Sequence, residues 1–336
     1  MNRSSILLGV ALVLAAICAV QLGSVIGKGT FDRADPASVT LGRLAISAVV
    51  LMLIARPRLF SFTGKTWLWM LMFGTTMAGM NLTFYLSIER IPVGVAVTIE
   101  LIGPLAVALF QSRRFRELVW VLLALAGVVI IGLQSFRGEM DPVGVLLAAS
   151  AGVFWGLYII ASKQVGQRVA GLKGLAVALM ISAVLVLPLA IVPLTNAVAA
   201  DPSILLPIGA IALLSSVLAY GLELISLRRI PTRVFGVMMA LEPAAAAAFA
   251  IMLLGETIGP LELVAIALVM IASAGVALTA KPAHERVVTG TVGTIIPADE
   301  SLDVRTGEIT LPSEDDEGHE GDDSDPRGID PDGGLR

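Results

Sequence analysis

The sequence is poor in cysteine, histidine and charge, and each shortage excludes a class of protein. Its 336 residues include one cysteine, Cys18, so neither a disulfide framework nor a cysteine-based metal site can form. Both histidines, His284 and His319, follow the last apolar segment, which leaves no histidine base or metal ligand in the body of the chain. The sequence patterns of zinc proteases, nucleophile-elbow hydrolases and P-loop proteins are also absent. We therefore expect a protein that is not an enzyme and has no metal site.

Charged residues make up 15% of the chain, against about 25% in an average soluble domain. They are unevenly distributed: residues 281–336 contain 15 acidic and 5 basic residues, whereas residues 1–280 contain 12 acidic and 18 basic residues. A segment with this much charge and so few aromatic residues cannot bury an apolar core. We expect residues 281–336 to form a disordered acidic tail.

Long apolar runs fill the rest of the chain. Each is close to 20 residues, the length that an α-helix needs to cross a hydrocarbon core of about 30 Å. The first run is interpreted as a span and not as a cleaved signal peptide, because no A-x-A cleavage site follows it. The sequence thus predicts an all-α membrane protein with ten transmembrane helices, at residues 5–27, 37–55, 66–87, 93–111, 117–135, 142–161, 172–192, 203–225, 233–254 and 260–280.

The basic residues of the short loops predict the orientation in the membrane. If the N-terminus is cytoplasmic, the cytoplasmic segments contain 15 lysine and arginine residues and the opposite loops contain 4. Cytoplasmic loops of membrane proteins carry such an excess of positive charge. We therefore expect a multi-pass protein of the plasma (inner) membrane with the N- and C-termini in the cytoplasm.

Two short patterns occur twice. "SIERIP" at 87–92 matches "SLRRIP" at 226–231 with an offset of 139, and "GV" at 9–10 matches "GV" at 144–145 with an offset of 135. Five spans per half is an odd number, so the second copy must be inverted in the membrane. Inverted repeats with a midplane site formed by interrupted helices are typical of secondary transporters. The predicted domains are two five-helix repeats, 1–139 and 140–280, followed by the tail at 281–336.

Two glutamates lie inside apolar runs and close to prolines. Glu100 precedes Pro104 by four residues, and Glu242 immediately precedes Pro243. Proline cannot donate to the carbonyl four residues earlier, so Pro104 and Pro243 are predicted to break their helices. A carboxyl group inside a membrane is costly and indicates function. Glu100 and Glu242 are therefore the candidate proton-coupling residues.

Arg43 is the only basic residue well inside a predicted span. At 1.5 Å per residue, Arg43 and Glu100 lie roughly 9–10 Å from the same surface. They can form a structural ion pair, or line the solute pathway and bind the carboxylate and the ammonium of an amino acid, and both can hold at once. Gln21 and Ser24 add two polar side chains on one helix face. The predicted substrate-binding residues are Arg43, Asn81, Tyr85, Glu100, Trp155, Tyr158 and Tyr220.

Two longer stretches resemble a known family. "GMNLTFYLSIERIPVGVAVTIELIGPLAVALFQSRR" (79–114) and "IPTRVFGVMMALEPAAAAAFAIMLLGE" (230–256) are similar to the EamA-type branch of the drug/metabolite transporter superfamily, and within it to the threonine/homoserine exporters. The resemblance covers about residues 5–280 and excludes the tail. It implies ten helices in two inverted repeats, proton-linked efflux and no cofactor.

The expected function is secondary-active export of small amino acids or related metabolites. The alternative is a broad-specificity drug or metabolite exporter, whose cavity would need a mainly aromatic and apolar lining. A channel is disfavoured because neither half has an acidic ring or a carbonyl filter. The expected partners are the small-molecule substrate, the proton and the lipid bilayer, without nucleic acid, and a monomer is the favoured oligomeric state.

Overall fold

A computed structural model describes residues 3–111, 115–136, 140–219, 222, 225–226, 229–230 and 232–279. Every regular element within these ranges is helical, which confirms the predicted all-α class. The predicted tail, residues 281–336, lies outside the described residues, and so does the predicted site residue Tyr220.

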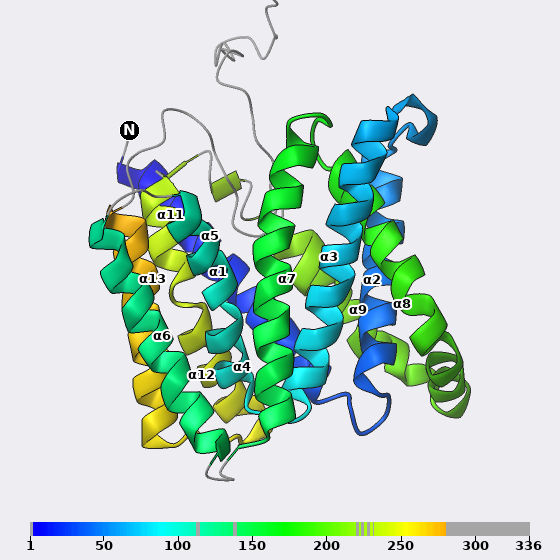
Figure 1. The fold of residues 1–336 in the computed structure, drawn as a ribbon. Helices are drawn as coiled ribbons and strands as arrows, with labels where there is room; N and C mark the ends of the chain where they lie inside the picture. The colour runs from blue at the N-terminus through cyan, green and yellow to red at the C-terminus, as the bar shows by residue number, and fades with distance from the viewer. Residues whose placement is uncertain are drawn as a thin grey trace, which may run out of the picture. The chain divides into compact units, whose positions relative to one another are not determined.

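The helices are arranged side by side, with their ends joined by short connections (Figure 1). The helices before residue 139 are α1 (Arg3–Lys28), α2 (Pro36–Ala55), α3 (Gly64–Ile88), α4 (Val93–Glu100), α5 (Ile102–Gln111) and α6 (Phe115–Phe136). Those after residue 140 are α7 (Pro142–Gly166), α8 (Lys173–Ala200), α9 (Leu205–Ala212), α11 (Thr232–Met239), α12 (Glu242–Leu254) and α13 (Pro260–Thr279). The short turns are η1 (Leu59–Ser61), η2 (Pro202–Ile204) and a π-helical turn, η3 (Leu213–Leu218).

Within the described residues, six helical segments are long and apolar enough to cross a membrane. They are Leu7–Lys28, Pro36–Ala55, Pro142–Gly166, Lys173–Ala200, Val234–Leu254 and Pro260–Leu278, and three shorter apolar segments accompany them. Helix α3 has the required length, but its threonines and Asn81 make it less apolar than these six. Large apolar side chains such as Leu53, Leu146 and Met252 face outward, as lipid contact requires.

Asp-Pro pairs begin three of the elements. Asp35, Asp141 and Asp201 precede α2, α7 and η2, and each carboxylate accepts a hydrogen bond from the backbone N–H two residues later, at 2.8–3.0 Å. Aspartate satisfies a free N–H group at a helix start, and proline fits the first helical position because its fixed φ angle is already helical. These three starts lie at one end of the molecule, the lower end in Figure 1.

Close helix contacts depend on small residues. Helix α3 packs against α7 and α8, and α2 packs against α8 (Figure 1). At Gly74 of α3, an added Cβ would lie only 3.0 Å from the Ala178 carbonyl oxygen of α8. Ser182 Oγ donates to the Gly74 carbonyl at 2.8 Å. Small residues that let helix backbones approach are typical of helix packing in membranes.

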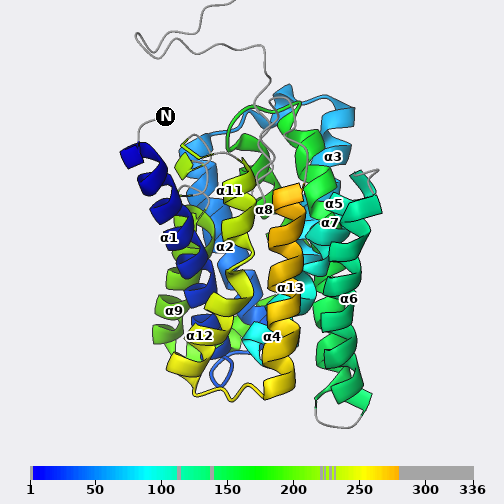
Figure 2. The same cartoon turned by 90° about the vertical axis from the view of Figure 1, so that its left-hand side faces the viewer.

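Helix α1 lies beside α9, η3 and α12, and α13 lies beside α6 (Figure 2). Helix α1 therefore contacts elements that come much later in the chain.

The two patterns that occur twice in the sequence make matching hydrogen bonds. Ser87 Oγ donates to the Gly144 carbonyl at 2.9 Å, and Ser226 Oγ donates to the Gly9 carbonyl at 2.9 Å. The serine of each "S-x-x-R-I-P" pattern thus bonds to the glycine of the other half's "GV" pattern.

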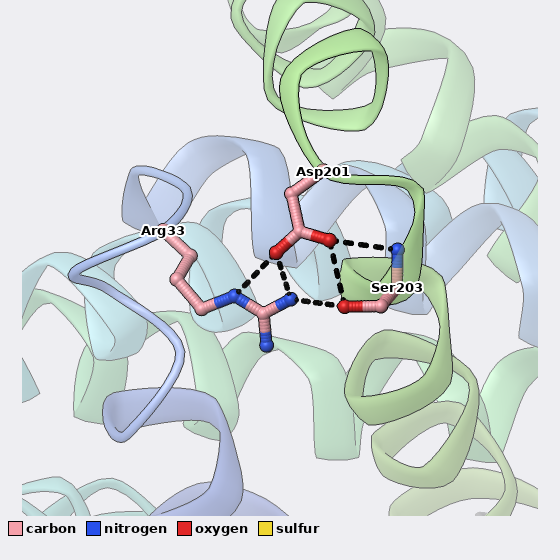
Figure 3. Close-up of polar contacts among 3 residues, drawn as sticks. All are labelled: Arg33, Asp201 and Ser203. Carbon is pink, nitrogen blue, oxygen red and sulfur yellow. Dashed lines mark hydrogen bonds and ion pairs between the residues drawn. The ribbon is translucent and has the colours of Figure 1, made fainter.

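Three ion pairs join residues before 139 to residues after 140, all at the lower end in Figure 1. They are Lys28 with Glu256, at 2.6 Å, Arg90 with Asp141, at 3.1 Å, and Arg33 with Asp201. Figure 3 shows the last of these, in which the Arg33 guanidinium also donates to the Ser203 hydroxyl, at 2.6 Å.

The Lys28–Glu256 pair is the least exposed of the three, with side-chain exposures of 21% and 11%. Lys28 Nζ also donates to the Ile91 carbonyl at 2.9 Å, and the Val93 N–H donates to Glu256 Oε2 at 3.0 Å. The Glu256 carboxylate therefore lies at the N-terminus of α4, where the helix dipole favours negative charge. These contacts tie α1, α4 and the α12–α13 connection together.

The carboxylates of the other two pairs, Asp141 and Asp201, are more exposed, and each accepts several hydrogen bonds. The backbone N–H of Val143 and, after it, the Arg90 side chain lower the pKa of Asp141 below its ordinary value. The hydroxyl of Ser203 and then the guanidinium of Arg33 lower the pKa of Asp201 in the same way. Both aspartates are therefore charged, and their ion pairs are present, at neutral pH.

Candidate substrate cavity

A helix interruption positions Glu100. Helix α4 ends at Glu100 and α5 begins at Ile102, four and two residues before Pro104. The proline removes the hydrogen bond that would hold the Glu100 carbonyl. This carbonyl instead faces α7, where an added Cβ on Gly152 would lie 2.8 Å from it. Freed backbone at membrane depth is tolerated where it is buried in protein or lines a cavity.

The second interruption positions Glu242. Helix α11 ends at Met239 and α12 begins at Glu242, with Pro243 in its first turn. Glu242 is the first residue of α12. Its exposed fraction is 5%, close to the 8% of Glu100. Each buried carboxyl group thus lies at a break in a helix, on opposite sides of that break along the chain.

Both glutamates line one cavity of about 80 Å³. A single water molecule needs about 10–15 Å³ measured in this way, so the cavity has room for several. Its walls come from seven elements that are far apart in the sequence. The lining residues are Val20, Gln21 and Ser24 of α1, Arg43 of α2, Met80, Asn81 and Phe84 of α3, Val97 and Glu100 of α4, Trp155 and Tyr158 of α7, Ser215 of η3, and Glu242 of α12.

Arg43 supplies the positive charge of the cavity. Its Nη1 donates to the Tyr85 hydroxyl at 3.4 Å, and its guanidinium carbon lies 5.6 Å from the centre of the Tyr85 ring. Among the described residues, no N–O distance of 4.0 Å or less joins Arg43 to Glu100, although both line the cavity. Arg43 and Glu100 therefore face the same cavity without forming a direct ion pair.

The structure brings most of the predicted residues together. Arg43, Asn81, Glu100, Trp155 and Tyr158 all line the cavity, as does Glu242. Tyr85 does not line it but lies behind Arg43, fully buried. Pro104 and Pro243 adjoin the cavity through the helix breaks that they accompany.

Three buried polar atoms of the cavity have no hydrogen-bond partner among the described residues. They are Oε1 of Gln21, Nε of Arg43 and Oγ of Ser215. A buried polar group without a partner costs about 1–3 kcal/mol, which a bound solute or water removes by completing the bond. Their occurrence in one cavity indicates a place for a polar ligand.

The structure gives roles to two residues, Ser215 and Glu256, that the sequence did not identify as candidates. Ser215 lines the cavity, and the adjacent serines 215 and 216 inside a long apolar run were the available signal. Glu256, in the quoted "LGE" pattern, forms the Lys28 ion pair, and no local pattern identifies a partner so distant in the chain. Within the described residues, no group of three histidine, cysteine, aspartate or glutamate side chains could hold a metal ion.

Comparison with known proteins identifies the family. The model of the EamA-like transporter family matches residues 142–278. The threonine/homoserine exporter RhtA of Escherichia coli (strain K12) is 36% identical over 287 residues, which cover 84% of this chain and 95% of the exporter. The chain belongs to the EamA-like transporter family. It is therefore a multi-pass membrane transporter and not an enzyme, and the predicted resemblance is confirmed.

Two further relatives and one solved structure match more than half of the chain. RhtA of Salmonella typhimurium (strain SL1344) is 37% identical over 81% of this chain and 92% of its own, and the uncharacterized transporter YwfM of Bacillus subtilis (strain 168) is 28% identical over 62% and 73%. A solved crystal structure aligns with 82% of this chain and 98% of its own, with a TM-score of 0.52 and 19% identity. That last likeness shows the fold alone.

Proposed function

We propose that this EamA-like transporter exports small hydroxylated amino acids of the threonine and homoserine type. The observation that carries the proposal is the cavity in which Arg43, Glu100 and Glu242 meet. A guanidinium can bind a substrate carboxylate through two parallel hydrogen bonds, and a carboxylate can bind an ammonium group. The similarity to threonine/homoserine exporters supports the same substrate class.

The open distance between Arg43 and Glu100 favours a substrate site over a purely structural ion pair. A pair that only neutralises two buried charges is most stable in direct contact. In this cavity the two groups form no direct ion pair, and Arg43 Nε has no partner among the described residues. A zwitterion that bridges them would complete both sets of bonds.

The proposed architecture is ten transmembrane helices in two inverted repeats, 1–139 and 140–280. It is supported by the matching contacts of Ser87 with Gly144 and of Ser226 with Gly9. Counted as spans, α4 with α5 and α11 with α12 are each one interrupted helix. Such helices line the midplane sites of transporters with inverted repeats.

The proposed orientation places both termini in the cytoplasm and the three ion pairs outside. In a Cys18→Ser background, a cysteine at exposed Asp32 should react with an impermeant thiol reagent added to intact cells. Cysteines at the exposed positions Phe60 and Lys65 should react only after the membrane is permeabilised. Labelling at Lys65→Cys from outside would overturn the orientation and the inverted repeat.

Export is proposed to be coupled to protons through Glu100, with Glu242 as the second candidate. Both carboxyl groups are buried in the cavity where the substrate would bind. A group that binds either a proton or the substrate ammonium can couple the two movements. Substrate and proton would then compete for one site.

Counterflow into proteoliposomes tests the proposed function. Vesicles that contain purified protein and unlabelled threonine should accumulate labelled threonine and homoserine, and empty vesicles should not. Tetraphenylphosphonium, a lipophilic cation, should neither be taken up nor compete with threonine. Uptake of the cation without uptake of any amino acid would replace this proposal with a broad-specificity exporter, which the lining by Phe84, Met80 and Val97 would then explain.

A further inference from the structure

Gln21 and Ser215 stand out among the polar residues of the cavity because their bonding groups are unused. Their exposed fractions are 3% and 2%, and neither Gln21 Oε1 nor Ser215 Oγ has a hydrogen-bond partner among the described residues. Ser24 and Asn81 also line the cavity, but their side chains donate to backbone carbonyls of their own helices, at 3.2 and 2.8 Å. Ser24 and Asn81 thus have hydrogen bonds within their own helices, whereas Gln21 and Ser215 each have an atom that lacks one.

The backbone around Ser215 is adapted to this position. Ser215 lies in η3, the π-helical turn that continues α9. Single π-helical turns inside helices are rare and frequently occur at functional sites. Ser215 Oγ fills the space that a Cβ on Gly23 would need, so the absence of a side chain at Gly23 lets η3 approach α1, the helix that carries Gln21.

The two unused groups are complementary to an alcohol. A hydroxyl group has one hydrogen to donate and lone pairs to accept with. Gln21 Oε1 can accept that hydrogen, and the Ser215 hydroxyl can donate to the alcohol oxygen. A methyl group in the same place would leave both buried groups unbonded, and a site built in this way rejects a substrate analogue that lacks the hydroxyl.

We propose that Gln21 and Ser215 form a hydroxyl subsite, which binds the side-chain alcohol of the amino acid and sets the preference for threonine and homoserine over analogues that carry a methyl group instead. The inference rests on the proposed function, since it requires that the cavity binds an amino acid. In this arrangement Arg43, Glu100 and Glu242 bind the charged groups common to all amino acids, and the hydroxyl subsite distinguishes among side chains.

The test compares threonine with valine, its near-isostere in which a methyl replaces the hydroxyl, and homoserine with norvaline. Half-maximal concentrations for counterflow are measured for each substrate with the wild type, Ser215→Ala and Gln21→Met. The wild type should prefer each hydroxylated substrate by about tenfold or more. Each variant should lose roughly three- to tenfold of that preference, mainly through weaker use of threonine and homoserine.

Ser162→Ala is the matched control. Ser162 is as buried as Ser215, with an exposed fraction of 1%, but its hydroxyl donates to the Ile159 carbonyl at 3.0 Å and it does not line the cavity. This variant should keep the wild-type preference. If Gln21→Met fails to insert into the membrane, Ser215→Ala decides the outcome, because it removes a single oxygen atom.

The outcomes separate the hydroxyl subsite from the proposed function. Wild-type counterflow of threonine, with threonine/valine and homoserine/norvaline ratios unchanged in Ser215→Ala, would overturn the subsite and leave amino acid export intact. Absence of counterflow for every amino acid in the wild type would overturn the proposed function and the subsite with it. A loss of preference in Ser215→Ala that Ser162→Ala does not share would support both.

Discussion

Glu100 and Arg43 share a cavity without touching, and this separation shapes what each side chain can do. Glu100 is 8% exposed and lines the cavity, so its carboxyl group has little water around it except what the cavity holds. Arg43 has one nitrogen without a partner among the described residues and another bonded to Tyr85 at 3.4 Å, a long hydrogen bond. A bound zwitterion would contact both side chains at once.

Glu100→Gln should abolish export driven by a pH gradient. Glutamine keeps the shape and the hydrogen bonds of the side chain but cannot exchange a proton. Threonine efflux from proteoliposomes with an imposed gradient should fall to the rate measured without one. Glu89→Gln, at an exposed position, should behave as the wild type. Normal gradient-driven transport by Glu100→Gln would make this carboxyl group structural and transfer the coupling role to Glu242.

Helix α7 supports the interruption between α4 and α5 through direct backbone contact. A Cβ on Gly152 would meet the Glu100 carbonyl oxygen at 2.8 Å, and a Cβ on Gly103 would collide with the Gly152 carbonyl. Neither contact can relax by rotating a side chain, because both partners are backbone atoms. The glycines therefore fix how closely α7 approaches the break.

Gly152→Ala should destabilise the protein. Alanine normally favours a helix over glycine by about 1 kcal/mol, but the added methyl here would force the two backbones apart, and such overpacking costs about 1–3 kcal/mol. The melting temperature in detergent should therefore fall. Gly132→Ala, in α6, is the control, since nothing lies within 4 Å of its added Cβ and its melting temperature should stay the same or rise. Equal shifts for both variants would refute the contact.

The sequence predicts the elements of this fold better than their contacts. Apolar length is a local feature, and the helices that it predicted at 37–55 and 260–280 match α2 and α13 to within one residue at each end. Helix α7 begins at 142 as predicted but ends at 166 instead of 161. The prolines at 104 and 243 predicted interruptions, and the structure has breaks at residue 101 and at residues 240–241, each within one turn before the proline. The π-helical turn at Ser215 and the side-chain partners of Lys28 and Arg33 depend on residues far along the chain, so no local pattern contains them.

The candidate site was partly predictable for a simple physical reason. Charged residues inside an apolar run are rare and energetically costly, so the sequence alone identified Arg43, Glu100 and Glu242 as candidates. Ser215 was not, because serine is common in helices that cross membranes and its role depends on the atoms around it. The position of Tyr85 behind Arg43, and not in the cavity lining, also required the structure.

The three ion pairs hold the two parts of the chain together at one end of the molecule, and the Arg33–Asp201 pair makes this contact sensitive to acid (Figure 3). The pKa of Asp201 is lowered by the Ser203 hydroxyl and by Arg33. A lowered pKa in the folded state means that the carboxylate contributes stability above its ordinary pKa of 3.8, and that this contribution is lost as the pH falls through the folded value.

Asp201→Asn should therefore lower the melting temperature slightly at pH 7, and the difference from the wild type should shrink toward zero as the pH falls below 3.8. The effect should also weaken in 1 M salt, because exposed charges are screened. Asp32→Asn changes an exposed carboxylate that lies next to Arg33, between α1 and α2, and forms none of the three ion pairs, so it should have no such pH-dependent effect. A difference that persists unchanged at acid pH would mean that the ion pair does not contribute.

Equilibrium binding of labelled threonine to the purified transporter, compared between the wild type and Arg43→Ala, tests most directly whether the cavity is an amino acid site. The wild type should bind threonine saturably, and Arg43→Ala should bind it roughly 10- to 100-fold more weakly, the range expected when a hydrogen-bonded charge is removed. Lys65→Ala, at an exposed position, should bind as the wild type does. Equal affinities in the wild type and Arg43→Ala would contradict the account, and so would a wild type that binds tetraphenylphosphonium but no amino acid.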